Sequence, residues 1–140
     1  MLRDFFEHGP GPLLRAGPLA LEMKGELLEV DLDAGATLSA YQLGVAFTQG
    51  AGVIQGGVVA AMLDYAMALA GFTRIAHGKS FGTVSLTTQF LKPVMPGRYL
   101  ARGRLDRAGS RMMYASAELR PEGSPGLVAT ACAVMAITDL

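Results

Sequence analysis

The sequence predicts an α+β fold, in which one long buried helix packs against a mainly antiparallel sheet. Residues 56–75 are apolar on nearly every side, which is typical of a helix enclosed by the rest of the chain. Four strand-like runs follow this helix, and short separators rich in turn-forming residues join them, as hairpins require. With 140 residues, the chain is expected to form one domain over residues 1–140.

The remaining elements follow from local patterns. The opening residues, MLRDFFEHGPGP, predict a short amphipathic helix that ends at two Gly-Pro pairs. Segments 17–31 and 36–47 carry mixed strand-like patterning. Segment 126–138 is apolar on both faces, which predicts a strand in the interior of the sheet. The four C-terminal strands are expected at 81–92, 97–107, 111–121 and 126–138.

The first of these strands, 81–92, alternates between apolar and polar residues. Because side chains of a regular strand point to opposite faces in turn, Val84, Leu86 and Phe90 are expected on one face. Thr83 is then expected on the other face, together with the neighbouring Ser, Thr and Gln residues.

Composition limits the possible partners and the cellular location. The 12 basic and 12 acidic residues give a net charge of zero, so a nucleic-acid partner is not indicated. Apolar residues make up 51% of this short chain, and a homo-oligomer interface is the simplest place for the excess. The lone Cys132 cannot form an internal disulfide. Asp4 and Glu7 interrupt any signal-peptide pattern, so the protein is expected to be cytoplasmic.

The glycine-rich run TQGAGVIQGG before the helix does not match a phosphate-binding loop. The dinucleotide pattern requires Gly where Gln55 stands, and the Walker pattern requires Lys where Val58 stands. The apolar run from Val58 to Phe72 is also too short to span a membrane, which takes about 20 residues, and Asp64 interrupts it. No membrane role is therefore expected.

Asp64 lies in the middle of this apolar helix, on a face of small residues. An ionised carboxylate is costly to bury without a partner, and none of its helical neighbours can pair with it. One interpretation is a hydrated acid on a face that reaches solvent. The other is an acid beside a closely approaching ligand. The neighbours on this face are Gly57, Ala60, Ala61, Ala68 and Gly71.

Gly56 and Gly57 open the same helix, where unpaired N–H groups and the helix dipole favour a developing negative charge. Such a position suits a carbonyl oxygen that becomes an oxyanion. Asp64 follows roughly 12 Å further along the axis, at 1.5 Å per residue. Only an extended substrate, or an acid from another subunit, could use both groups, and this favours a site shared between subunits.

The stretch FTQGAGVIQGGVVAAMLDYAMALA, followed by TVSLTTQFLKPVMPG, resembles a known family. It is similar to the hotdog-fold acyl-CoA thioesterases of the PaaI-like family, named for the phenylacetate pathway and related to 4-hydroxybenzoyl-CoA thioesterases. The resemblance covers essentially the whole chain, and its specific part is 47–97. It implies a hotdog fold, in which a sheet wraps one central helix.

The resemblance also implies roles for individual residues. Asp64 matches the acid that acts as base or nucleophile, and the N–H of Gly56 matches the donor that polarises the thioester carbonyl. Gln49 would help to place the acid or a water, and Thr83 would assist. Gln55 departs from the family, which has His there, and Gln cannot transfer a proton near neutral pH. A non-catalytic acyl-thioester-binding protein is therefore the alternative to a hydrolase.

The resemblance implies that the substrate is an aryl- or medium-chain acyl-CoA. Coenzyme A is then part of the substrate, and no separate cofactor is expected. Homodimers are implied in which Asp64 of one chain faces Gly56 of the other, and the dimers are expected to pair into a homotetramer. No metal site is expected, because His8 and His77 show no ligand spacing. Substrate contacts are predicted at Gly57, Met67, Lys92, Ser110 and Arg111.

Overall fold

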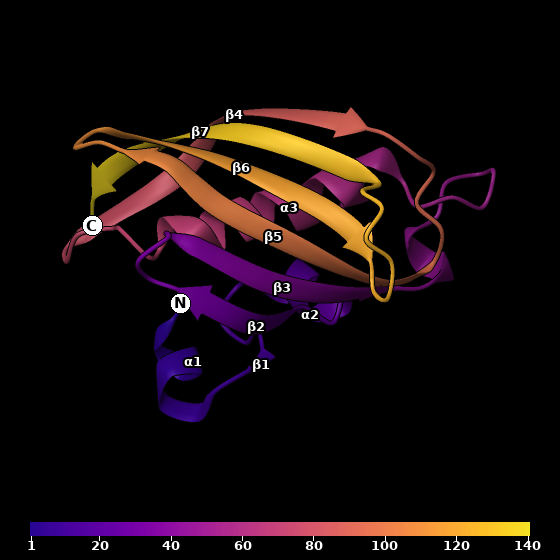
Figure 1. The fold of residues 1–140 in the computed structure, drawn as a ribbon, viewed down its shortest axis with the longest axis horizontal. Coiled ribbons are helices and arrows are strands. Elements are labelled where there is room, and N and C mark those ends of the chain that lie inside the picture. Colours follow the sequence, from indigo (N-terminus) through magenta and orange to yellow (C-terminus); the bar gives the residue numbers. More distant parts are fainter.

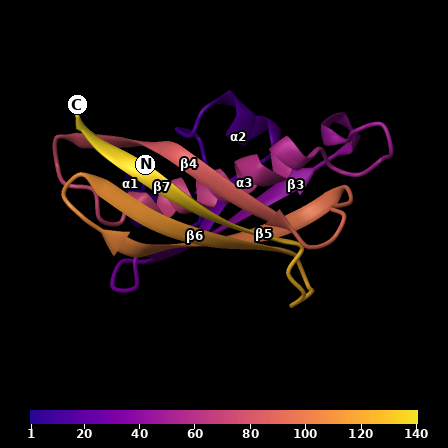
Figure 2. The same ribbon diagram turned by 90° about the horizontal axis from the view of Figure 1, so that it is seen from above.

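The computed structural model describes residues 1–140 and confirms the α+β hotdog fold. Helix α3 (Gly56–Gly71) lies across one face of a seven-stranded sheet that curves around it (Figures 1 and 2). Every strand pairing is antiparallel, in the order β1-β2-β3-β5-β6-β7-β4. The other elements are α1 (Arg3–His8), β1 (Gly11–Pro12), α2 (Pro18–Glu22), β2 (Glu26–Asp31), β3 (Ala36–Leu43), a 3-10 turn (Val45–Phe47), β4 (Lys79–Phe90), β5 (Gly97–Ala108), β6 (Met112–Pro121) and β7 (Ala129–Asp139).

Most predicted elements occur close to their expected positions. β7 has β6 on one side and β4 on the other, so its predicted interior position is confirmed. None of the helices is long and apolar enough to cross a lipid bilayer. Figure 1 shows the N-terminal helix α1 beyond β2 and β1, whereas β4 forms the opposite edge of the sheet.

Three predicted boundaries were wrong. Strand-like segment 36–47 ends as a strand at Leu43, and Val45–Phe47 form a 3-10 turn after Gly44. Residues 18–22 form helix α2 and not part of a strand, because Pro18 occupies the first helical turn and good helix formers follow it. Helix α3 ends at Gly71 and not near residue 75. There the hydroxyl of Thr73 donates to the carbonyl of Ala70 over 2.6 Å, which satisfies one of the last carbonyls and closes the helix.

Close contact between α3 and the sheet depends on Gly103 of β5. A Cβ atom at this position would lie 2.0 Å from the carbonyl oxygen of Ala66 in the helix backbone. The absence of a side chain therefore lets the helix rest directly on the strand. Around this contact the core is rich in methionine, with Met23, Met62, Met67, Met113 and Met135 fully buried.

Strand β4 pairs with β7 along one edge only, so its other edge is unpaired. A β-bulge at Val84 inserts an extra residue, and Thr83 therefore pairs with the buried Met135. Leu86 pairs with Ala133, which faces the helix as well. The predicted separation of Thr83 and Leu86 onto opposite faces is wrong, because the bulge shifts the alternation by one residue.

Candidate active site

Asp64 is held by a hydroxyl from the edge strand. It lies two turns into α3 and is partly buried, and the Oγ1 of Thr83 donates a hydrogen bond to its Oδ1 over 2.8 Å. No Lys, Arg or His forms an ion pair with it. The carboxylate is therefore oriented by a neutral donor and not by a cation.

The N-terminus of α3 presents unpaired donors. Gln55 is the N-cap residue, and its side chain makes no capping hydrogen bond. Neither the Gly56 N–H nor the Gly57 N–H donates to the preceding turn, and the first helical turn contains no acidic residue. Because these N–H groups stand at the positive end of a 16-residue helix, they favour an anion or a developing oxyanion.

A cavity of about 860 Å³ lies at this end of the helix. Loop 49–56, Val59 and segment 90–94 line it. Two backbone hydrogen bonds hold its walls, from Ile54 N–H to the Val94 carbonyl over 2.7 Å and from Gln49 N–H to the carbonyl of Val53 over 2.8 Å. The Gly56 donor therefore faces a preformed and mainly apolar space.

Two glutamines line this cavity. The Oε1 of Gln49 accepts the N–H of Ala51 over 2.6 Å, which leaves its side-chain NH₂ group as the free donor. Gln55 is exposed and makes no side-chain hydrogen bond. Both can orient a water or a carbonyl oxygen, but neither can exchange a proton near neutral pH.

Residues 51–127, more than half of the chain, match the thioesterase superfamily. The chain belongs to this superfamily. The predicted resemblance and the predicted thioester hydrolase class are thereby confirmed at the level of the family. The sequence has no significant match among curated proteins.

Solved structures support the same assignment for this thioesterase. A phenylacetic acid degradation-related protein from Ralstonia eutropha JMP134 is 32% identical, with a TM-score of 0.83, over 96% of this chain and 98% of that one. A thioesterase from Haemophilus influenzae shares the fold at 19% identity and a TM-score of 0.81, over 92% and 88% of the two chains. The Escherichia coli PaaI protein of the phenylacetic acid degradation operon shares it at 17% identity and a TM-score of 0.76, over 86% and 84%.

The substrate contacts predicted for this thioesterase do not all lie together. Gly57 is exposed beside Gly56, and Lys92 lines the cavity. Ser110 and Arg111 lie in the β5–β6 turn at the opposite end of the sheet, where the Arg111 carbonyl accepts the N–H of Ile137. Met67 is fully buried in the core and does not line the cavity, so its substrate contact stays a prediction.

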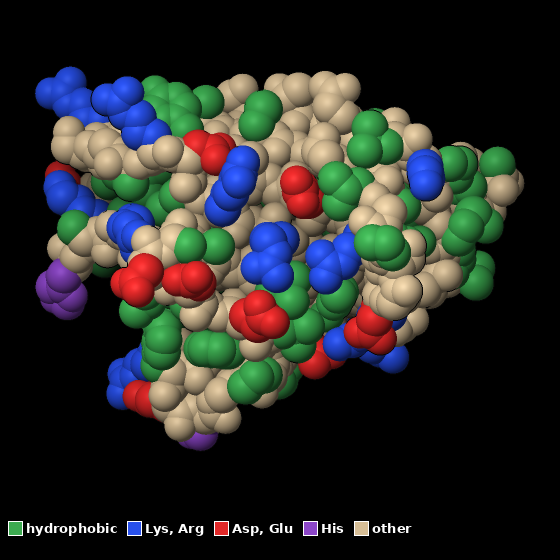
Figure 3. All heavy atoms as spheres, viewed as in Figure 1, with side chains coloured by type: hydrophobic (Ala, Val, Ile, Leu, Met, Phe, Trp, Pro, Cys, Tyr) green, Lys and Arg blue, Asp and Glu red, His purple; other side chains and the backbone are tan.

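The arginines of β5 are mostly engaged within the chain. Figure 3 shows basic and acidic side chains interspersed on the face of the sheet away from α3, and no single basic patch. Two hydrogen-bonded carboxylates raise the pKa of Arg98 above its ordinary value. The ion pairs are Arg98 with Glu26 and Glu122, both at 2.7 Å, Arg102 with Glu29 at 3.6 Å, and Arg104 with Asp106 at 3.2 Å.

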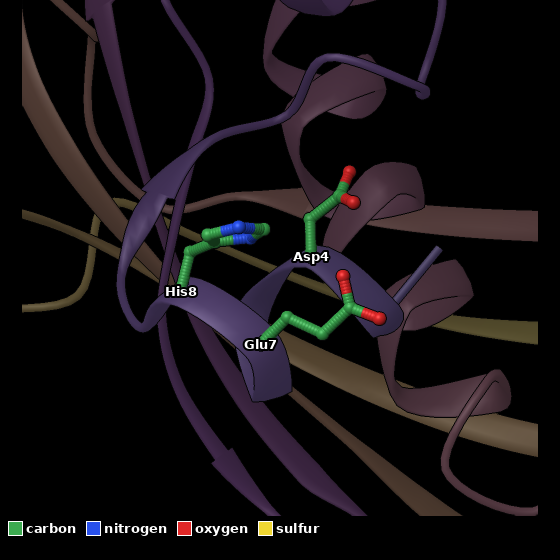
Figure 4. A group of neighbouring side chains, drawn as sticks. All are labelled: Asp4, Glu7 and His8. Atoms are coloured by element: carbon green, nitrogen blue, oxygen red, sulfur yellow. The ribbon is translucent and has the colours of Figure 1, made fainter.

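One cluster of possible metal ligands lies far from this site, on α1. The ligand atoms of Asp4, Glu7 and His8 lie within 4.8 Å of one another (Figure 4), a proximity that was not predicted for His8. Their i, i+3 and i+4 spacing places them on one helix face, which explains the proximity. Arg15 and Arg3 already form ion pairs with the two carboxylates, at 3.2 and 2.7 Å.

Proposed function

We propose that this thioesterase hydrolyses an aryl- or medium-chain acyl-CoA to the free acid and coenzyme A. The observation that carries the proposal is the pairing of a hydroxyl-oriented acid, Asp64, with unpaired N–H groups at Gly56 and Gly57 on the same helix. A base and an oxyanion donor are the two groups that thioester hydrolysis requires.

In the proposed reaction, the thioester carbonyl oxygen accepts a hydrogen bond from the Gly56 N–H. Asp64 removes a proton from water, the water oxygen bonds to the carbonyl carbon, and the C–S bond then breaks. The thiolate leaves and takes a proton, so that acid and thiol are the products. In a second route with the same residues, the Asp64 carboxylate attacks the carbonyl carbon directly, and water hydrolyses the resulting anhydride.

The separation of the two groups along α3 favours a site made by two chains. Gly56 and Asp64 are eight residues apart on α3, which is about 12 Å along the axis. A carbonyl group bound to the Gly56 N–H and a water bound to Asp64 bridge a shorter distance than this, since each hydrogen bond is about 3 Å long. The site is therefore proposed to combine Asp64 of one chain with Gly56 of its partner.

The edge strand supports this arrangement. β4 runs antiparallel to α3, because Thr83 contacts Asp64 while Phe90 lies beside Gly56. If two chains pair through their free β4 edges, a two-fold axis midway between Thr83 and Phe90 brings Thr83 opposite Phe90 of the partner. Asp64 of one chain then faces Gly56 of the other, and exposed Leu86 becomes covered at the interface.

The same pairing supports a coenzyme A site made by two chains. Lys92 lies at the Gly56 end of one chain, and Ser110 and Arg111 lie at the Asp64 end of the other, so the pairing brings these groups to the same end. Their cations could then hold phosphates of coenzyme A.

Pairing of two dimers into a tetramer is proposed through the outer face of β7 and β4, where small uncharged side chains predominate. They are Ser85, Thr87, Thr130, Cys132 and Thr138.

A panel of aryl- and straight-chain acyl-CoAs, with release of free thiol as the readout, tests the proposed function. Asp64→Asn is expected to abolish turnover, while Glu118→Gln, which removes an exposed carboxylate on the other face of the sheet, is expected to retain it. Binding without thiol release by the wild type would overturn the hydrolase proposal. Activity gained in Gln55→His would then favour the alternative, an acyl-thioester-binding protein, which the non-titrating Gln55 in the cavity supports.

A further inference from the structure

Phe90 is unusual for an edge-strand residue. Its side chain is 57% exposed, yet the ring lies against the start of α3. A Cβ atom on Gly56 would lie 3.4 Å from the Cζ of Phe90 and 3.6 Å from its Cε1. Phe90 pairs with the fully buried Ala129, so it shares the helix side of the sheet. The ring therefore forms a wall of the cavity next to the free Gly56 N–H.

The residues that line this cavity differ in burial and in charge. Its inner part is lined by Ile54, Val59 and Val94, which are 4%, 1% and 3% exposed. Lys92 is the single charged residue among those that line the cavity, and it is exposed. Because coenzyme A is large and charged, its arm must leave toward solvent. The apolar inner part is left for the acyl group.

A carbonyl oxygen bound to Gly56 brings the acyl group close to Phe90. The oxygen would lie about 2.9 Å from the Gly56 nitrogen, and the α-carbon of the acyl group is two covalent bonds from that oxygen. A flat or linear group can lie along an aromatic ring at the usual contact distance of about 3.5–4.0 Å. At a branched tetrahedral α-carbon, one of the two substituents leaves this plane and would instead approach the ring.

We propose that Phe90 determines acyl specificity, by admitting groups that are planar or unbranched at the α-carbon and excluding groups branched there. Planar aryl groups gain most, because they can pack in an offset arrangement against the ring. This inference rests on the proposed acyl-CoA hydrolase function, and it narrows the substrates to thioesters of aryl or α-unbranched acids.

The test compares kcat/KM for benzoyl-, hexanoyl- and isobutyryl-CoA in the wild type, Phe90→Ala and Phe90→Leu. In Phe90→Ala, loss of aromatic packing is expected to lower kcat/KM for benzoyl-CoA about two- to tenfold. Removal of the Phe90 ring is expected to raise kcat/KM for isobutyryl-CoA. The isobutyryl-to-benzoyl ratio of kcat/KM therefore rises in Phe90→Ala. Phe90→Leu keeps an apolar side chain, so it should retain hexanoyl turnover and lose the benzoyl preference. Phe6→Ala is the matched control, since Phe6 is 55% exposed on α1, beyond the opposite sheet edge.

An isobutyryl-to-benzoyl ratio in Phe90→Ala equal to that of the wild type would overturn the role of Phe90, even if hydrolysis itself is confirmed. A wild type that releases no thiol from any of the three would overturn the hydrolase function instead. In that case the same acyl groups are compared by calorimetry as coenzyme A analogues with CH₂ in place of sulfur. Tighter binding of the benzoyl analogue than of the isobutyryl analogue, lost in Phe90→Ala, supports the specificity role. Equal binding, or no binding, overturns it.

Discussion

Replacement of Thr83 by Val tests whether the edge strand positions the acid. Thr83 donates the one side-chain hydrogen bond that Asp64 receives, at 2.8 Å, and Val has nearly the same shape without the hydroxyl. A hydrogen bond to a charged group contributes about 1.5–3 kcal/mol, and exposure of Thr83 to solvent moves the value toward the lower end. Since about 1.4 kcal/mol corresponds to a factor of ten, kcat/KM is expected to fall about tenfold.

The assay is steady-state thiol release from the best acyl-CoA of the panel, together with urea unfolding of each variant. Thr87→Val is the matched control, because it removes the same hydroxyl from an exposed position on the other face of β4. Both variants should unfold at nearly the same urea concentration as the wild type, since neither hydroxyl is in the core. Only Thr83→Val should lose activity.

Two results would contradict this reasoning. Wild-type kcat/KM in Thr83→Val, or a loss no greater than in Thr87→Val, would show that the hydroxyl does not hold Asp64 for the reaction. A matching loss of stability would show that Thr83 acts through folding and not through the acid.

Three further predictions concern stability and assembly. Gly103→Ala should lower the free energy of unfolding by about 1–3 kcal/mol or more, because its Cβ would lie 2.0 Å from the Ala66 oxygen; Gly82→Ala, which meets no atom within 4 Å, is the control in urea unfolding. Leu86→Lys places like charges beside the proposed two-fold axis and should yield monomers in sedimentation, whereas an unchanged mass would contradict pairing through β4. Burial raises the pKa of Tyr41 above its ordinary 10.0, so its contribution to stability is complete below pH 10 and is lost as the pH rises further. Urea unfolding of Tyr41→Phe should therefore vary less above pH 10 than that of the wild type.

Much of the fold could be predicted because its signals are local. The turn-forming separators mark the hairpins, and the apolar run after Gly57 marks the buried helix. Segment 17–31 was harder, because a five-residue helix beginning at Pro18 has too few residues to show a helical period. The β-bulge at Val84 also has no sequence signal, since it is defined by pairing with β7.

The site was predictable to the extent that residue type indicates chemistry. An acid in an apolar helix and a Gly pair at its start indicated Asp64 and Gly56, and the structure supplies the hydrogen bond from Thr83. The position of Phe90 beside Gly56 was not predicted, because it depends on how β4 crosses the helix. Within one chain, Lys92 and the β5–β6 turn lie at opposite ends of the sheet. This was not predicted, because it depends on the three-dimensional arrangement of the strands.

The bulge at Val84 has a consequence for comparisons between related sequences. Residues on one face of a regular strand are separated by an even number of positions, but Thr83 and Phe90 share a face at a separation of seven. A relative with a regular strand would carry the equivalent pair six positions apart. Deletion of Val84 should therefore leave the hydroxyl beside Asp64, whereas an alignment without a gap would match Thr83 to a residue on the wrong face. Insertions and deletions in this strand are best judged by pairing with β7 and not by distance along the chain.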